Sequence, residues 1–113
     1  MKKLLFALLL LVSLPIVMQA NPARKVTLAY DAQTRKLTAT ILHPVKNVEK
    51  HYISAVTVMV GDKELEVKEL TKQATDEQEV VEFTLPDLPK GTEVTVKAKC
   101  NQFGSKSGKV ILE

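Results

Sequence analysis

The chain has 113 residues and a formal net charge of +3 at neutral pH. Lys2 and Lys3 supply two of these charges inside a predicted leader, so the rest of the chain carries a net charge of only 3 − 2 = +1. A nearly neutral chain with few aromatic side chains lacks the basic stripe of a nucleic-acid-binding domain, and we expect no nucleic acid partner.

Residues 1–20 have the three parts of a secretory signal peptide. Two lysines precede a largely apolar run over residues 4–17, and Ala20 is a small residue suited to the position before a cleavage site. We therefore predict a signal peptide over residues 1–20 and an exported domain over residues 21–113, periplasmic or secreted. After cleavage we expect no stable membrane anchor; a retained N-terminal anchor is the alternative interpretation.

The exported part contains seven short runs in which apolar and polar residues alternate, as they do in β-strands. Turn-forming residues separate the runs, and no helical pattern of normal length interrupts them. The sequence therefore predicts an all-β fold, an immunoglobulin-like antiparallel β-sandwich of about seven strands. The runs cover residues 25–30, 36–42, 52–60, 64–70, 80–85, 92–100 and 109–112.

Two parts of this pattern lead to specific expectations. In the fourth run, Leu65 and Val67 should face inward and Lys68 outward. The polar, acidic segment 71–79 is interpreted as a solvated loop, and the segment 101–108, which contains Gly and Ser, as a second loop.

Cys100 is the only cysteine of the chain. Export leads to an oxidising compartment where structural cysteines usually come in pairs, and a single cysteine excludes an intramolecular disulfide. Such a thiol is a metal ligand, a reactive group, half of an intermolecular bridge or a buried core residue. Cys100 ends the sixth run on its apolar face, which suits a core residue and also a ligand at the end of a strand.

Both histidines of the chain, His43 and His51, flank one irregular, charged segment. Loop histidines are usually solvated, but two imidazoles and the thiolate of Cys100 form a metal-ligand set if the fold brings them together. We therefore take His43, His51 and Cys100 as the candidate metal ligands. Glu49 or Asn101 could add an oxygen ligand.

Three short segments carry a resemblance to a known family. They are His-Pro at 43–44, Glu-Lys-His-Tyr-Ile at 49–53 and Ala-Lys-Cys-Asn-Gln-Phe-Gly at 98–104. In order and spacing they resemble the iron-binding domain of the desulfoferrodoxin and superoxide reductase family, over nearly the whole of residues 21–113. The resemblance implies an immunoglobulin-like fold and a mononuclear, non-haem ferrous iron. Four imidazoles and one axial thiolate would hold this iron, and an open position would meet superoxide.

Residue by residue, His43 and His51 match two of the family's histidines, and Cys100 matches the axial thiolate. Phe103 stands where the family has its last histidine, and residues 22–25 contain no counterpart of the first one. Because the chain has only two histidines, a single copy cannot build the four-imidazole plane. We expect the Phe103 ring to pack against the core instead.

The resemblance thus implies an exported iron-binding domain that reduces superoxide by one electron, with an electron donor or another periplasmic protein as its partner. Three alternatives stay open. The two imidazoles and the thiolate suit zinc or copper about as well as iron. The domain could instead be a degenerate, non-catalytic sandwich that binds a protein partner or a sulfur species, or two chains could associate as a homo-oligomer and complete one site.

Overall fold

The computed structural model describes residues 22–113, and the predicted signal peptide at residues 1–20 lies outside them. This part of the chain contains seven strands and no helix, and therefore no helix that could cross a membrane. Every strand pair is antiparallel, which confirms the predicted all-β class. The strands are β1 (Lys25–Asp31), β2 (Lys36–Leu42), β3 (Ile53–Val60), β4 (Lys63–Glu69), β5 (Gln78–Thr84), β6 (Glu93–Cys100) and β7 (Ser105–Ile111).

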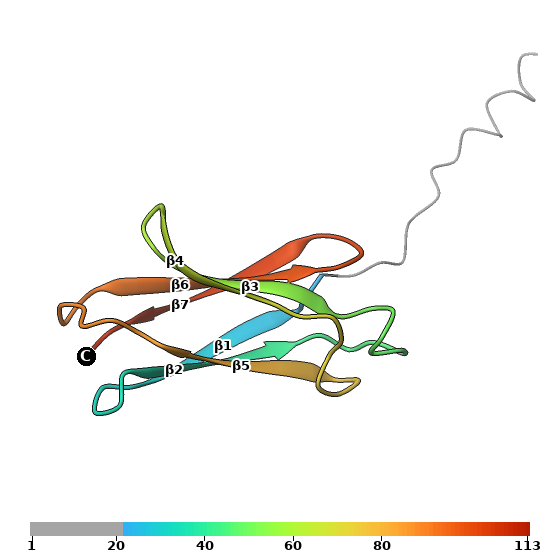
Figure 1. The fold of residues 1–113 in the computed structure, drawn as a ribbon, viewed down its shortest axis with the longest axis horizontal. Helices are drawn as coiled ribbons and strands as arrows, with labels where there is room; N and C mark the ends of the chain where they lie inside the picture. The colour runs from blue at the N-terminus through green and yellow to red at the C-terminus, as the bar shows by residue number, and fades with distance from the viewer. Residues whose placement is uncertain (1–21) are drawn as a thin grey trace, which may run out of the picture.

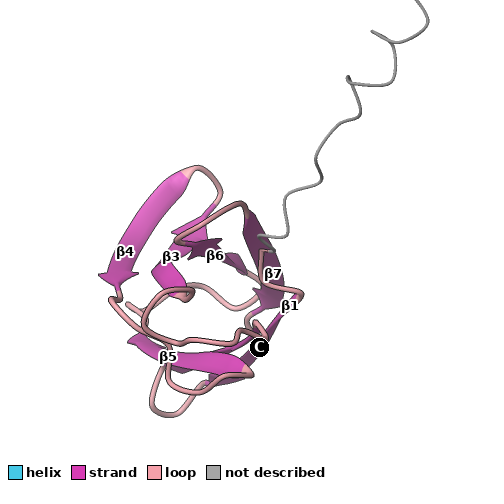
Figure 2. Cartoon of the chain, turned by 90° about the vertical axis from the view of Figure 1, so that its right-hand side faces the viewer, coloured by secondary structure: helices cyan, strands magenta, loops and turns pink. Residues whose placement is uncertain are grey.

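The strands form two sheets that face each other as the layers of a sandwich (Figures 1 and 2). One sheet has three strands in the order β1-β2-β5, and the other has four in the order β4-β3-β6-β7. Hairpins join β1 to β2, β3 to β4 and β6 to β7, whereas the other three connections cross between the sheets. This is the sandwich architecture that the alternating runs predict.

Alternate residues of the strands point into the space between the sheets, as pleated strands require. Leu37, Ala39 and Ile41 of β2 are fully buried, and Phe83 of β5 is the largest buried side chain among the described residues. Burial of one large apolar side chain contributes about 1.5–3 kcal/mol, so this layer is the main source of stability. Buried and more exposed residues alternate along β2, β5 and β6, as the predicted alternation of apolar and polar residues requires.

Strands β1 and β7 lie side by side where one edge of the sandwich closes (Figure 2). Gly108 of β7 allows this approach, because a Cβ atom there would lie 2.5 Å from the carbonyl oxygen of Val26 on β1. Strand β7 also corrects an expectation, since it starts at Ser105, inside the predicted loop 101–108. Hydrogen bonding to β6 from that residue onward overrides the turn-like composition of the segment.

Strand β4 corrects a second expectation, because a β-bulge changes which side chains face inward. The register between β3 and β4 shifts at one position and leaves Leu65 as an extra residue on β4. Beyond it the faces are exchanged, so Val67 is 44% exposed and Lys68 faces inward. The Lys68 ammonium lies 5.3 Å from the centre of the Phe83 ring and donates a hydrogen bond to the carbonyl oxygen of Glu82 on β5.

The segment 71–79, predicted to be a solvated loop, is buried in two places. Gln73 is completely buried, and Glu79, which already belongs to β5, is 6% exposed. The Glu79 carboxylate accepts hydrogen bonds from the backbone N–H groups of Ala74 and Val80, which offset the cost of its burial. In a sequence, a polar side chain that is buried with partners looks the same as a solvated one.

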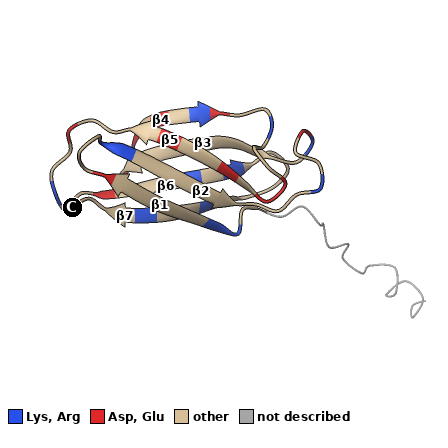
Figure 3. Ribbon diagram, turned by 90° about the horizontal axis from the view of Figure 1, so that it is seen from below, with Lys and Arg blue, Asp and Glu red and all other residues tan. Residues whose placement is uncertain are grey.

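Charged residues of both signs occur toward both ends of the sandwich (Figure 3). Two exposed ion pairs, Lys36 with Glu82 and Lys109 with Glu93, join neighbouring strands at 3.5 and 3.6 Å. Exposed pairs of this kind contribute at most about 1 kcal/mol each, so the fold does not depend on them.

Three loops meet at one end of the sandwich, on the right of Figure 1. The β2–β3 loop (43–52) forms backbone hydrogen bonds with the β4–β5 loop (70–77) on one side and with the β6–β7 loop (101–104) on the other. Because both histidines lie in the 43–52 loop, we call this the histidine end of the sandwich.

Candidate metal centre

His43 is held where strand β2 ends. Its backbone N–H donates to the carbonyl oxygen of Glu77 at 2.9 Å, and that of Val45 donates to Asp76 at 2.7 Å. Pairing with the chain before β5 therefore continues past the end of β2, although Pro44 has no N–H to donate and interrupts the regular ladder. The His43 residue is only 1% exposed.

A turn at Asn47 places His51 shortly before strand β3. The backbone N–H groups of Lys50 and His51 both donate to the carbonyl oxygen of Asn47, at 3.2 and 2.9 Å. The Asn47 side chain also accepts the N–H of Glu49 at 3.0 Å, as Asn does in turns of this kind. Ile53 follows and is fully buried as the first residue of β3, so it fixes the position of His51 relative to the core.

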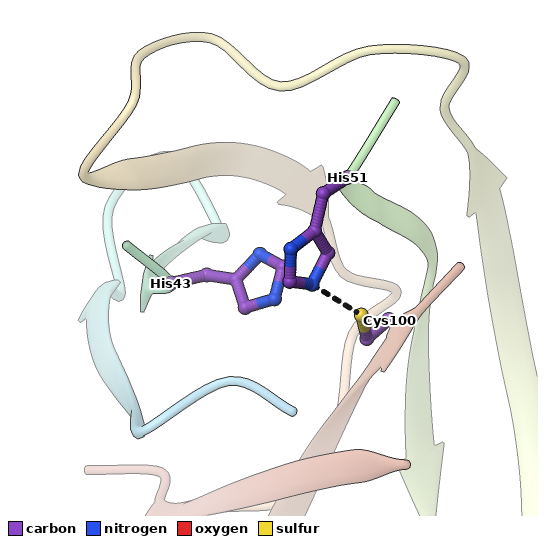
Figure 4. Close-up of side chains that lie close together, drawn as sticks. All are labelled: His43, His51 and Cys100. Carbon is purple, nitrogen blue, oxygen red and sulfur yellow. Dashed lines mark hydrogen bonds between the residues drawn. The ribbon is translucent and has the colours of Figure 1, made fainter. Parts of the chain in front are cut away.

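Cys100 is the last residue of β6 and lies opposite Ile53 of β3. The alternation along β6 turns its side chain inward, and the residue is 2% exposed. Because His51 precedes Ile53 by two residues, this pairing brings the His51 ring next to the thiol. The distance from His51 Nε2 to Cys100 Sγ is 3.1 Å (Figure 4).

His43, His51 and Cys100 therefore form one group, although they come from three separate positions in the chain. One ligand atom from each of them lies within 4.8 Å of the other two. The two imidazole rings meet edge to face, with their centroids 4.7 Å apart and their planes at 90° (Figure 4). His43 and Cys100 are buried, whereas His51 is partly exposed and forms the outer side of the group.

The composition and spacing of this group fit a single metal ion. Imidazole nitrogens and cysteine thiolates bind zinc, copper and iron, with bond lengths of about 2.0–2.3 Å for zinc. Two ligands of one ion are then about 3–4 Å apart, so small rotations of the side chains would bring all three atoms to bonding distance.

Gln73, from the β4–β5 loop, lies next to His43 and is a site residue that the sequence analysis missed. Its Oε1 is 2.7 Å from His43 Nδ1, and its Nε2 donates to the carbonyl oxygens of His43 and Thr75 at 2.7 and 2.9 Å. Its backbone N–H donates to the carbonyl oxygen of Val48 at 3.0 Å. One glutamine in a polar loop gives no signal in the sequence that could have identified this role.

The β6–β7 loop holds the group from the other side. Asn101 Oδ1 accepts the N–H of Tyr52 at 2.9 Å, and its Nδ2 donates to the carbonyl oxygen of Lys50 at 3.0 Å. Asn101 therefore connects two loops, and its side-chain oxygen, considered from the sequence as a ligand, accepts a backbone N–H. The backbone N–H of Gln102 donates to Cys100 Sγ at 3.4 Å, so this loop also contacts the thiol directly.

Phe103 is 65% exposed, which contradicts the expectation that its ring packs against the core. Strands β6 and β7 stay paired up to the four-residue loop 101–104, so the tip of this hairpin projects beyond the sheet. Glu49, the other oxygen donor considered from the sequence, is exposed and lies outside the group of three.

A surface pocket opens beside His51 at the histidine end. Lys46 and Lys50 line it and bring positive charge next to the imidazole. Positive charge around a pocket attracts anions, and here it would attract them toward the side of the group that His51 forms. The other lining residues are Pro44, Val45, Asn47 and Gln102.

Comparison with known proteins finds likeness in structure but not in sequence. No protein-family model and no curated protein sequence matches the chain. A superoxide reductase (1Fe-SOR) from Giardia intestinalis has a TM-score of 0.63 at 20% identity, covering 81% of this chain and 100% of that one. A crystal structure of an oxidized superoxide reductase gives 0.57 at 14% identity, covering 86% and 94%. A hypothetical protein from Pyrococcus horikoshii OT3 gives 0.53 at 16% identity, covering 86% and 93%.

These similarities define the class of fold. The described part of the chain is a seven-stranded antiparallel sandwich of the superoxide reductase type. Within this fold, His43, His51 and Cys100 lie close enough together to bind a metal ion.

Proposed function

We propose that this protein is an exported metal-binding domain in which His43, His51 and Cys100 hold one iron ion and support the one-electron reduction of superoxide. The observation that carries the proposal is the approach of three ligand atoms to within 4.8 Å of one another. The similarity of the fold to two superoxide reductases supports iron as the metal. Export, proposed from the N-terminal sequence, would place the domain in the periplasm or outside the cell.

The chemistry divides between the metal and the side chains. Bound ferrous iron would supply one electron, which with two protons converts superoxide to hydrogen peroxide. The His43 and His51 rings hold the ion through nitrogen lone pairs, and the Cys100 thiolate donates electron density to it. Each turnover consumes one electron, so the proposal includes an electron-donor protein as partner.

Lys46 and Lys50 have a separate role in this proposal. Superoxide is an anion, and positive charge around a pocket raises the rate at which an anion reaches it. Both lysines line the pocket beside His51, the partly exposed member of the group. Since exposed charges are screened by salt, the rate of encounter should fall as ionic strength rises.

The number of ligands limits how far the analogy with superoxide reductases extends. The chain offers two imidazoles and one thiolate, whereas the family resemblance implies four imidazoles and one thiolate. We therefore propose metal binding as the primary property of this domain and expect superoxide reduction to be slower than in proteins with the full ligand set.

A zinc or copper site built from the same residues is the second candidate. Two nitrogens and one sulfur with an open position are the donor set of some catalytic zinc sites, and of electron-transfer copper sites when a weak axial ligand is added. Met59 is the only methionine in residues 21–113, but it pairs with Thr95 in the interior of β3. A thioether ligand is therefore not part of this proposal.

Elemental analysis tests metal binding directly. Purified protein would be loaded anaerobically with ferrous iron, zinc or cuprous copper and then desalted, alongside Cys100→Ser and His51→Ala. We expect about one ion per chain in the natural protein and loss of the ion in both variants. Lys46→Ala is the matched control, because Lys46 lines the pocket without belonging to the group, and it should retain the metal.

The outcome also identifies the metal. Retention of iron, followed by superoxide consumption without oxygen release, would support the reductase chemistry, whereas retention of zinc or copper alone would favour the second candidate. Metal retention by both ligand variants, or none by the natural protein, would overturn the proposed site.

A further inference from the structure

The side-chain amide of Gln73 lies between three polar groups. Two of them are the backbone carbonyl oxygens of His43 and Thr75, at 2.7 and 2.9 Å from Gln73 Nε2. A carbonyl oxygen can only accept a hydrogen bond, so the NH₂ group of the amide must face both of them. The orientation of the amide is therefore fixed, and its Oε1 faces the ring of His43.

This orientation determines which nitrogen of His43 carries the hydrogen. His43 Nδ1 lies 2.7 Å from Gln73 Oε1, and an amide oxygen can only accept. The hydrogen must therefore be on Nδ1. A neutral imidazole has one ring hydrogen, so Nε2 carries the lone pair, and a lone pair is what a metal ligand needs.

Burial means that solvent water cannot take over the hydrogen bonds between Gln73 and His43. Gln73 is 0% exposed and His43 1% exposed, so solvent water does not compete for their hydrogen bonds. Leaving one buried polar partner unsatisfied costs about 1–3 kcal/mol. The backbone N–H of Gln73 also donates to Val48, so the same residue is tied to the loop that carries both histidines.

We propose that Gln73 is a positioning residue of the metal centre, which holds His43 in the Nδ1–H tautomer and presents Nε2 to the ion. The inference rests on the proposed function, because it assumes that His43 is a ligand. Gln73 acts through His43 and is not itself a ligand. Removing the hydrogen-bond partner of a ligating histidine typically weakens metal binding 10–100-fold.

Two substitutions separate positioning from a merely structural role. Gln73→Met has nearly the same length and removes all three side-chain hydrogen bonds. Gln73→Glu keeps an oxygen acceptor for His43 Nδ1 but loses the NH₂ donor to the two carbonyl oxygens. Gln33→Met is the matched control, since it makes the same substitution at an exposed glutamine in the turn between β1 and β2, outside the histidine end.

The first measurement is the ¹⁵N and ¹H NMR spectrum of the histidine rings in metal-free protein. We expect a hydrogen on Nδ1 of His43 in the natural protein, in Gln73→Glu and in Gln33→Met, and loss of this preference in Gln73→Met. Backbone amide spectra of the same samples show whether each variant is folded. The hydrogen on Nε2 alone in the natural protein would overturn the inference.

The second measurement is the affinity for Zn²⁺ or Co²⁺, by competition with a coloured chelator. Gln73→Met should bind about 10–100-fold more weakly, whereas Gln73→Glu and Gln33→Met should stay within about threefold of the natural protein. Equal losses in Gln73→Met and Gln73→Glu, or no loss in either, would contradict positioning. If the natural protein binds no metal, the proposed function itself fails, and the ring spectra still decide the tautomer.

Discussion

Phe83 and Phe103 are the same residue type in opposite environments. Phe83 is 1% exposed and packs between the sheets, whereas Phe103 is 65% exposed at the tip of the β6–β7 hairpin. The contribution of a phenylalanine to the free energy of unfolding depends on the apolar surface area that folding buries, so the two rings should contribute very differently.

The pair gives a direct test of this difference. We expect Phe83→Ala to lower the free energy of unfolding by about 3–5 kcal/mol, since it removes buried surface and leaves a cavity. Phe103→Ala should change it by no more than about 0.5 kcal/mol, as an exposed substitution does. Urea titration followed by circular dichroism measures both, and comparable losses would contradict the exposed placement of Phe103.

The residues of the candidate centre differ in how far the sequence alone could identify them. His43, His51 and Cys100 are the only residues of their types in the chain, and their chemistry suits a metal. Gln73 escapes prediction because its place in the site depends on hydrogen bonds to His43, which is 30 residues away in the sequence and is brought near by folding. The packing expected of Phe103 is wrong, since a short hairpin loop carries it away from the core.

Among the strands, β4 is the element whose role is least visible in the sequence. It lies at the edge of the four-stranded sheet, and β5 lies at an edge of the three-stranded sheet. The bulge in β4 turns Lys68 inward, toward β5. Lys68 then contacts the Phe83 ring and the carbonyl oxygen of Glu82. An inward-facing charge also discourages another chain from pairing with an edge strand.

The contacts that Lys68 makes with β5 can be tested by removing its ammonium group. Lys68→Ala should lower the free energy of unfolding by about 1–2 kcal/mol, because it removes a charged hydrogen bond, a cation–π contact and the packing of the side-chain stem. Lys63→Ala, at an exposed position of the same strand, should stay within about 0.5 kcal/mol. Thermal or urea unfolding compares them, and equal effects would show that Lys68 does not join the edges.

For the whole molecule, the candidate centre joins the two layers of the sandwich. His43 follows β2 of the three-stranded sheet, whereas His51 precedes β3 and Cys100 ends β6, the two central strands of the four-stranded sheet. An ion held by all three would therefore link both sheets at the histidine end. Export, an electron donor and self-association remain predictions at this scale.

Metal binding should accordingly raise the stability of the entire domain. At a free metal concentration 100 times the dissociation constant, binding adds about 2.7 kcal/mol to the free energy of unfolding. In a domain of this size, that corresponds to a rise of about 10–20 °C in Tm. Differential scanning calorimetry with and without metal measures the rise. Cys100→Ser should show little of it, and an equal rise in that variant would indicate binding elsewhere.

By itself, the sequence determined the all-β class, the seven strands and most of their inward faces. These features follow from alternation with period two, which is a local property of each strand. It also identified the three residues with metal-binding chemistry. Only the tertiary structure decided the exchanged faces of β4, the early start of β7, the burial of Gln73 and the meeting of His43, His51 and Cys100. Each of these depends on the register between segments far apart in the chain, such as Ile53 opposite Cys100, and no local pattern contains that register.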